Sequence, residues 1–257
     1  MLLAIDSGNT NIVFAVYDGE TRLGLWRAAT AQARTADDHA VWLSSLMRMH
    51  DLEPNQITDT IICSVVPHAL FELKQLCRGF FGCEPVIVSQ NLDLGIKILI
   101  DNPGSAGADR LANAVGVNKT YGGPAIVLDF GTGTTFDVVD RSGNYCGGVI
   151  APGINLSLKA LHDAAAHLPR IDVARPNKVI GGGTVEAMQS GVYWGYLGLI
   201  EGLVSRIATE FGSPMKVIAT GGLAPVFAGA TDAITEVDPD ITLTGIVEIW
   251  KRAKGTP

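Results

Sequence analysis

The chain has 257 residues, which is enough for one large domain or two of ordinary size. It carries 26 acidic and 19 basic residues, a net charge of -7, and no cluster of Lys and Arg, which argues against nucleic acid and anionic membranes as partners. Its four cysteines lack a CxxC pair or metal-ligand spacing, which favours free thiols. The first residues are predicted to form a buried strand and not a signal peptide, and there is no uninterrupted apolar run of about eighteen residues, so we expect a cytoplasmic protein.

The sequence predicts an α/β fold in which short apolar runs alternate with glycine-rich turns. In the first half we expect strands at 2–6, 11–18 and 22–27, a helix at 37–49, a strand at 59–65, a helix at 67–80 and a strand at 85–89. After a helix at 105–120, we expect strands at 125–129, 135–140 and 145–150, helices at 153–164 and 184–210, a strand at 216–219 and a helix at 241–252. The order of elements therefore repeats.

The repeat is also visible residue by residue, because Asp6 and Asp129 lie 123 positions apart in similar surroundings. A shift of 123 aligns Ile5–Asn9 with Leu128–Thr132, and aligns Val13, Ala15 and Val16 with Phe136, Val138 and Val139. Each copy is predicted to be a β-hairpin with a carboxylate at its mouth. We therefore predict two lobes, residues 1–104 and 105–257, bridged by the helix at 105–120 and separated by a ligand cleft.

The first turn, Asp6–Asn11, has the composition of an anion-binding turn. Gly8 lets the backbone approach a ligand closely, and the N–H groups with Asn9 and Thr10 can donate to phosphate oxygens. A carboxylate beside phosphates is repulsive unless a cation lies between them, so Asp6 indicates Mg²⁺, bound directly or through water. The alternative is an Asx-type turn in which Asp6 and Asn9 only close the hairpin.

The second turn, Asp129–Thr135, supplies three hydroxyls and two glycines and can wrap a polyphosphate. Two such turns at equivalent positions of duplicated lobes favour nucleotide binding over ordinary hairpins. Asp129 is a candidate ligand for a second cation. Neither a G-x-x-x-x-G-K-[ST] motif nor a dinucleotide G-x-G-x-x-G motif after a strand is present. Gly221 and Gly222, after the strand at 216–219, form a turn where an adenine ring could lie against bare backbone.

The segment Gly104–Arg110 opens the helix at 105–120 and contains two charged residues. An Asp in a first helical turn is common, whereas an Arg there is disfavoured unless it has an anionic partner, so Arg110 is a candidate for substrate binding. Asp109 is the best-placed general base for accepting a proton from an alcohol. The alternative is an Asp–Arg pair on the surface.

A second glycine-rich segment, Gly181–Gly183, precedes the helix at 184–210, with Thr184 predicted as its N-cap and the free amides available to a ligand. Glycines recur along one face of that helix at Gly191, Gly195, Gly198 and Gly202, which costs helix propensity at each position. We interpret the stripe as the contact for a closely packed helix, from the other lobe or from a second subunit, with ordinary core packing as the alternative.

Several motifs in order closely resemble the type III pantothenate kinase family, from about residue 1 to 250. They are Asp6–Thr10, Asp101–Pro103 with Gly107–Arg110, Asp129–Thr135, Gly147–Gly148 with Ala151–Gly153, and Glu186–Gly191. The resemblance implies duplicated ribonuclease-H-like (actin-like ATPase) lobes, with mixed β-sheets flanked by helices and a nucleotide cleft between the lobes. It also implies phosphorylation of pantothenate by ATP, the first step toward coenzyme A, in a homodimer that uses Mg²⁺ and a monovalent cation, K⁺ or NH₄⁺.

The resemblance also assigns residue roles. It implies ATP contacts from the first turn and strand (Asp6, Ser7, Gly8, Asn9, Thr10, Asn11, Ile12 and Val13) and from Gly131 and Thr132 in the second turn. Asp129 becomes the monovalent-cation ligand. The pantothenate contacts are Gly107, Ala108, Asp109 and Arg110, with Asp109 as the base, and Thr184.

This chain departs from the family pattern near the acceptor, where Ala165 and Gly183 replace a usual Thr and Asn, and Gly133 replaces a usual Ala. Missing polar groups near an acceptor bear on specificity. Two other functions therefore stay open: a kinase of the same superfamily with another small acceptor, and a non-catalytic ATP-binding regulator. Intact Asp6, Asp109 and Asp129 argue against the regulator, and the Asp109–Arg110 loop argues against another acceptor.

Overall fold

The computed structural model describes residues 1–165 and 168–255. Among these residues, no helix is both long and apolar enough to cross a membrane. The chain divides into two compact units. One unit contains Met1–Thr120 together with the described residues from Ile241 onward, and the other contains Tyr121–Asp240. This division differs from the predicted boundary between residues 104 and 105.

The first unit is built on a five-stranded sheet in the order β3-β2-β1-β4-β5. Its strands are β1 (Leu2–Ser7), β2 (Asn11–Asp18), β3 (Thr21–Ala29), β4 (Asp59–Ser64) and β5 (Val86–Ile87). The first three are antiparallel neighbours, whereas β4 runs parallel to β1 and β5 runs parallel to β4. Helices α1 (Ala36–Arg48) and α2 (Pro67–Gln75) bury one face of this sheet in an apolar core.

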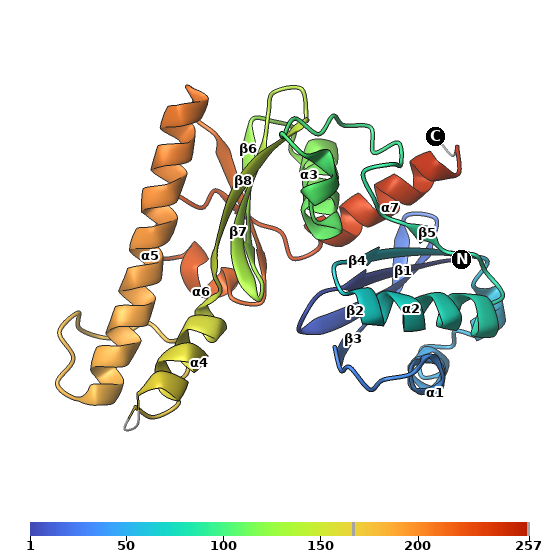
Figure 1. Ribbon diagram of the computed structural model, residues 1–257, viewed down its shortest axis with the longest axis horizontal. Helices are drawn as coiled ribbons and strands as arrows, with labels where there is room; N and C mark the ends of the chain where they lie inside the picture. The colour runs from blue at the N-terminus through green and yellow to red at the C-terminus, as the bar shows by residue number, and fades with distance from the viewer. Residues whose placement is uncertain (166–167, 256–257) are drawn as a thin grey trace. The chain divides into compact units, whose positions relative to one another are not determined.

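Two further helices, α3 (Ala108–Thr120) and α7 (Ile241–Ala253), contact β4, and α7 also contacts β1, on the face away from α1 and α2 (Figure 1). These two helices cross at glycines: a Cβ on Gly245 would collide with the carbonyl of Ala112, and one on Gly116 with the carbonyl of Ile241. Thr242 also donates a hydrogen bond of 2.7 Å to Asn113. This close contact places α3 in the first unit, although we had predicted that it bridges the lobes.

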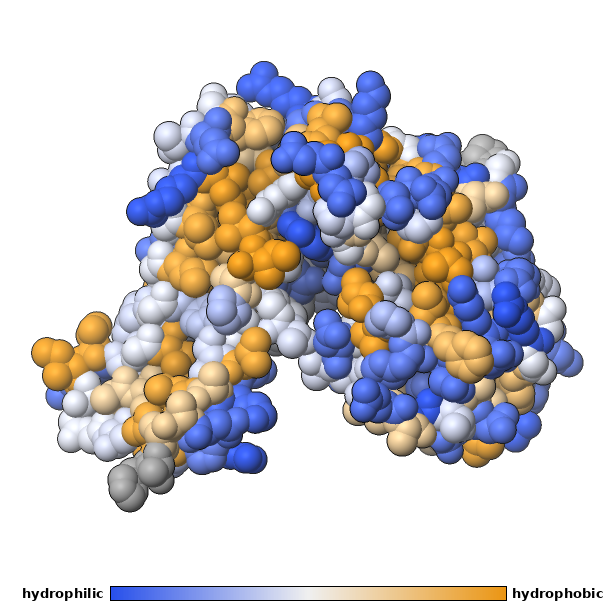
Figure 2. Space-filling model, viewed as in Figure 1, coloured by the Kyte–Doolittle hydropathy of each residue, from blue (hydrophilic) through white to orange (hydrophobic). Residues whose placement is uncertain are grey.

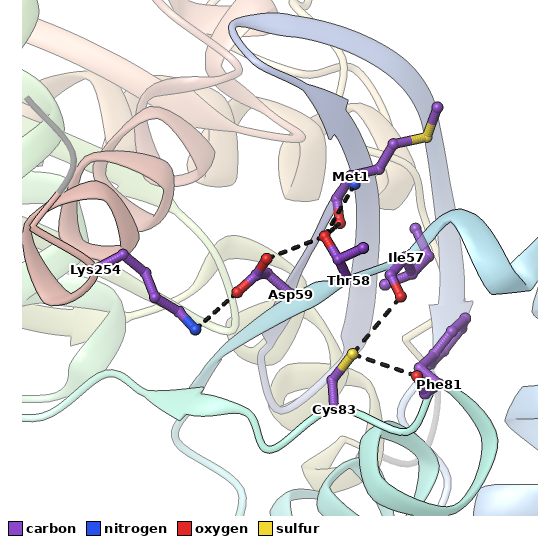
Figure 3. Close-up of polar contacts among 7 residues, drawn as sticks. All are labelled: Met1, Ile57, Thr58, Asp59, Phe81, Cys83 and Lys254. Atoms are coloured by element: carbon purple, nitrogen blue, oxygen red, sulfur yellow. Dashed lines mark hydrogen bonds and ion pairs between the residues drawn. The ribbon is translucent and has the colours of Figure 1, made fainter.

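The residue after α7 is also fixed to this unit. Lys254 Nζ lies 2.7 Å from Asp59 Oδ1 at the start of β4, and Thr58 donates to the other carboxylate oxygen at 3.0 Å (Figure 3). Although partial burial acts in the opposite direction, these two partners lower the pKa of Asp59. Because the pair is partly exposed to solvent, its contribution to stability is small, and the glycine crossing is the main contact that holds α7.

The second unit repeats the same sheet in the order β10-β9-β6-β7-β8. Its strands are β6 (Ala125–Phe130), β7 (Gly133–Val139), β8 (Tyr145–Pro152), β9 (Lys216–Gly221) and β10 (Glu236–Val237). Again β6, β7 and β8 are antiparallel neighbours, whereas β9 runs parallel to β6 and β10 runs parallel to β9. Helices α4 (Ile154–Ala164), α5 (Thr184–Phe211) and α6 (Ala224–Ala228) contribute to the core on one face.

The duplication is confirmed, with one correction to the alignment. β1 and β6 begin 123 positions apart and have the same pattern of buried residues. The second turn, however, is one residue shorter, because Ser7 pairs with Ile12 whereas Phe130 pairs with Thr134. Phe136 is therefore equivalent to Phe14, not to Val13 as the shift of 123 suggested. Since strand side chains alternate between faces, only this register keeps an apolar ring in both cores.

Every predicted element has a counterpart, some with different ends, whereas the short helix α6 and the two-residue strand β10 were not predicted. The helix predicted at 67–80 keeps α-helical geometry only to Gln75 and continues as a π-type segment, Leu76–Phe80. Two short 3₁₀ turns, Pro54–Gln56 and Pro103–Ser105, were not predicted. The latter turn explains why α3 begins at Ala108 and not at residue 105.

Candidate active site

The first turn is held by hydrogen bonds within its own hairpin and by hydrogen bonds from the residue after β3. Gly8 donates its N–H to Asn11 at 3.0 Å, which closes the loop. Thr30, the residue after β3, donates its N–H to the Thr10 carbonyl at 2.9 Å and its hydroxyl to the Gly8 carbonyl at 2.7 Å. Asn9, Thr10 and Asn11 are left exposed. The turn is thus held at its backbone while its polar side chains stay accessible; the sequence interpretation had missed Thr30.

The carboxylates of Asp6 and Asp109 both raise the pKa of one buried thiol, that of Cys63. Asp6 pairs in register with Cys63 on the neighbouring parallel strand, so these two side chains share a face of the sheet. Burial raises the pKa of Cys63 well above its usual value, and the charges of Asp6 and Asp109 raise it further. The first turn and the start of α3 are thus near each other in the first unit. Cys63 was not singled out from the sequence, because a lone apolar-flanked cysteine in a strand resembles core.

Asp109 lies in a partly enclosed position at the start of α3. Burial raises its pKa, while the N–H of Arg110, 2.8 Å from Oδ1, and the Arg110 charge act in the opposite direction. A Cβ on Gly107 would lie 2.5 Å from the same carboxylate oxygen and 3.6 Å from Val65. Gly107 therefore gives Asp109 the room to fold back over the end of β4. A carboxylate with a raised pKa is a stronger base than an ordinary one.

The second turn is closed by a bond from the Gly131 N–H to the Gly133 carbonyl at 3.1 Å. Gly131 and Thr132 are exposed. Behind the turn, Asp129 pairs in register with Thr135 on β7 and with Thr220 on β9, so one carboxylate and two hydroxyl side chains share a face at this end of the sheet.

The Gly221–Gly222 turn follows the strand next to β6. Gly221 has a φ of +89°, and a Cβ there would lie 2.6 Å from the Phe130 carbonyl oxygen. Close backbone packing therefore accounts for Gly221. At Gly222 a Cβ would meet nothing within 4 Å, so this position is open.

The prediction for Thr184 needs a correction. The structure places Gly183 at the N-cap of α5, and Thr184 is the first helical residue. Glu186 instead satisfies a free amide there, accepting the Gly182 N–H at 2.8 Å. An acidic side chain in the first turn suits the helix dipole, so the local competition favours Glu186. Thr184 is exposed and lines an apolar groove between α4 and α5, together with Pro152, Met188 and Tyr196.

The glycine stripe of α5 faces open space. A Cβ at Gly191, Gly195 or Gly198 would meet no atom within 4 Å among the described residues outside the local helix backbone. Core packing is therefore not the reason for the stripe. Apolar side chains are also exposed nearby, at Leu156, Leu161, Val179, Ile180 and Val185. Figure 2 shows apolar surface over α4 and the first half of α5.

The predicted site residues are divided between the two units. Asp6–Val13 and Gly107–Arg110 belong to the first unit, whereas Asp129, Gly131–Thr132, Thr184 and Gly221–Gly222 belong to the second. Of the family departures, Ala165 is described, but the adjoining Ala166 and His167 lie outside the described residues. Among the described residues, no group of three or more His, Cys, Asp or Glu side chains is close enough to hold a metal ion.

Comparisons with known proteins agree with this architecture. A Campylobacter jejuni protein described as a Baf family transcriptional activator has the same fold, with a TM-score of 0.63 at 19% identity over 98% of this chain and 99% of its own. A ROK hexokinase from Thermus thermophilus superposes with a TM-score of 0.50 at 15% identity over 99% of both chains. Two sheets of one topology, each flanked by helices, define a protein with the duplicated ribonuclease-H-like fold that is also called actin-like.

The sequence comparisons identify the family. The model of the type III pantothenate kinase family matches residues 2–206. A type III pantothenate kinase from Paramagnetospirillum magneticum is 62% identical over 98% of this chain and 97% of its own. The chain belongs to the type III pantothenate kinase family.

Proposed function

We propose that this chain transfers a phosphoryl group from ATP to pantothenate, giving 4'-phosphopantothenate in the first step of coenzyme A biosynthesis. Family membership over nearly the whole chain is the observation that carries this proposal. The two duplicated turns and the partly buried Asp109 supply a physical reason for it. Phosphoryl transfer needs little covalent chemistry from a protein, and depends on positioning and on charge stabilisation.

In this proposal Asp109 accepts the proton of the pantothenate hydroxyl as that oxygen attacks the γ-phosphorus, while the bond from this phosphorus to the β–γ bridging oxygen breaks and ADP leaves. Its raised pKa supports the role, because a base whose pKa lies closer to the working pH takes a proton more readily. Gly107, Ala108 and Arg110 contact the acceptor, with Arg110 binding its carboxylate. Thr184, exposed at the start of α5, is the proposed acceptor contact in the second unit.

The first turn contacts the ATP phosphates through Ser7, Gly8, Asn9, Thr10, Asn11, Ile12 and Val13, and the second turn does so through Gly131 and Thr132. Gly221 and the open Gly222 contact the adenine. Asp6 holds Mg²⁺ directly or through water. A single carboxylate suits this ion, since Mg²⁺ keeps several waters and takes the rest of its ligands from substrate phosphates. When bound, it neutralises charge that develops on the transferred group.

We also propose that Asp129 binds a monovalent cation, K⁺ or NH₄⁺. Its register partners Thr135 and Thr220 support this assignment, because they add hydroxyl oxygens on the same face. The Thr135 hydroxyl also donates to the buried carboxylate of Asp137 at 3.2 Å. Asp129→Ala is expected to remove the response of ATP turnover, and of thermal melting, to added KCl, with NaCl at equal ionic strength as the control.

A homodimer through α5 completes the proposal. The unfilled glycine stripe and the exposed apolar side chains around it support an interface in which a second copy packs against this face. Glycines let helix backbones approach closely, which offsets their cost in helix propensity.

A coupled assay of ADP release tests the function. We expect turnover with pantothenate and stimulation by K⁺ over Na⁺. Turnover only with other small alcohols would point to a kinase with a different acceptor. ATP binding without turnover of any acceptor would point to a non-catalytic regulator. Phosphorylation of the acceptor is to be verified by mass spectrometry, so that ATP hydrolysis by water is not mistaken for transfer.

A further inference from the structure

The two turns are supported from behind by equivalent backbone contacts. In the sheet registers, Asn11 pairs with Ala29 in the first unit, and Gly133 pairs with Pro152 in the second. The next residues are Thr30 and Gly153. Thr30 donates its N–H to the Thr10 carbonyl at 2.9 Å, and Gly153 donates its N–H to the Thr132 carbonyl at 3.1 Å. Each turn is therefore fixed to the end of its third strand by the same hydrogen bond.

The two units differ in the second contact that supports each turn. In the first unit the Thr30 hydroxyl donates to the Gly8 carbonyl at 2.7 Å, so one residue holds the turn at two points. In the second unit the equivalent residue is Gly153, which has no side chain, and there is no room for one at this position. A Cβ at Gly153 would collide with the Thr132 carbonyl oxygen and lie 2.8 Å from the Gly131 carbonyl oxygen. The second turn is thus packed directly against the backbone of Gly153.

Support for that backbone comes from α5. Tyr196, which is 8% exposed, donates its hydroxyl to the Pro152 carbonyl and lies 3.0 Å from the Ser157 hydroxyl in α4. Pro152 has no N–H, so its carbonyl is its one backbone hydrogen-bonding group. Tyr196 therefore ties together the end of β8, the start of α4 and the Gly153 backbone on which the second turn lies.

We propose that Thr30 and Tyr196 are positioning residues for the two turns: each fixes the residue behind a turn, and so sets where the turn presents its backbone amides. This inference rests on the proposed function only in taking the turns as phosphate-binding. Neither residue is proposed to touch ATP. Displacement of phosphate-binding amides by a fraction of an ångström weakens binding and misaligns the transferred group.

Matched pairs of variants test each support. Thr30→Val removes the hydroxyl at nearly constant shape, whereas Thr30→Ser keeps it. Tyr196→Phe removes the second hydroxyl, and Tyr193→Phe makes the same change three residues away on α5, where the Tyr193 ring packs on Phe227. The measurements are the Kd for ATP with Mg²⁺ and no acceptor, the KM values for ATP and pantothenate, and the melting temperature.

The loss of one such hydrogen bond should weaken ATP binding about three- to tenfold. We expect this effect for Thr30→Val and Tyr196→Phe, with the KM for pantothenate unchanged, and we expect changes under about twofold for Thr30→Ser and Tyr193→Phe. The inference is overturned if each variant behaves like its control. It is also overturned if Tyr196→Phe and Thr30→Val lower only the melting temperature.

The outcomes separate this inference from the function. If the unmodified chain binds ATP but does not phosphorylate pantothenate, the proposed acceptor is wrong, while the Kd comparison still decides the role of Thr30 and Tyr196. If the unmodified chain binds no ATP, both proposals fail.

Discussion

Asp109→Asn separates the chemistry of Asp109 from its structural contacts. Asn has the same shape and retains an oxygen that can accept the Arg110 N–H, the 2.8 Å bond made by Oδ1. It cannot accept a proton from an alcohol. General bases contribute about 10²- to 10⁴-fold to rate, so kcat should fall by that factor, which corresponds to about 3–5 kcal/mol of activation free energy. The Kd for ATP should change less than about twofold.

The same variant also makes a prediction about stability. Because burial raises the pKa of Asp109 in the folded chain, the ionised form is disfavoured there, and stability decreases as pH rises through that pKa. Asp109→Asn removes this penalty. It should therefore unfold at the same or a slightly higher urea concentration than the parent at pH 7, and the difference should vanish below the unfolded-state pKa of about 4.

Asp37→Asn is the matched control, since Asp37 is an exposed acidic residue in the first turn of α1. We expect it to retain parental kcat and ATP affinity. Steady-state kinetics, calorimetric ATP binding and urea unfolding complete the comparison. If Asp109→Asn keeps the parental kcat, Asp109 is not the base. If kcat falls because ATP binding and urea resistance fall with it, the residue has a structural role and the reasoning from its burial fails.

Three further predictions concern the fold and its assembly. Gly245→Ala should lower the free energy of unfolding by about 1–3 kcal/mol, because the new methyl group meets the Ala112 carbonyl. Gly229→Ala, with open space around it, should not lower it, and urea denaturation checks both variants. Gly195→Leu should give folded monomers in sedimentation analysis, and a stable dimer of this variant would exclude the α5 face as the interface. His39 is 2% exposed, and burial, followed by the Arg34 charge, lowers its pKa from 6.5 to about 4. The stabilising contribution of neutral His39 should therefore be complete above about pH 6.5 and decline by up to about 3 kcal/mol as pH falls toward 4. His39→Gln should reduce this decline. If the free energy of unfolding of the variant depends on pH as in the parent, His39 does not titrate in this way.

The strands and turns were predictable because their signals are local. A period of two in apolar residues marks a strand, and glycine with small polar residues marks a turn, so both hairpins could be located and compared from the sequence. The carboxylates at their mouths, Asp6 and Asp129, were found in the same way. Asp109 was found because an Asp–Arg pair at a helix start is unusual. The same local signals gave the wrong N-cap for α5, because Thr184 and Glu186 compete for the free amides and the sequence does not decide between them.

Contacts between distant segments were decided only by the tertiary structure. Thr242 and Asn113 are 129 residues apart, and the glycine crossing beside them assigns α3 to the first unit. Thr30 and Gly153 support the turns across strand ends, and Cys63 lies beside Asp6 through a parallel strand pairing. The sequence by itself determined the family, the two hairpins and the identity of the charged groups, because these follow from neighbours along the chain. Burial, strand register and close backbone packing depend on which distant segments meet, and these set the pKa of Asp109 and the position of each turn.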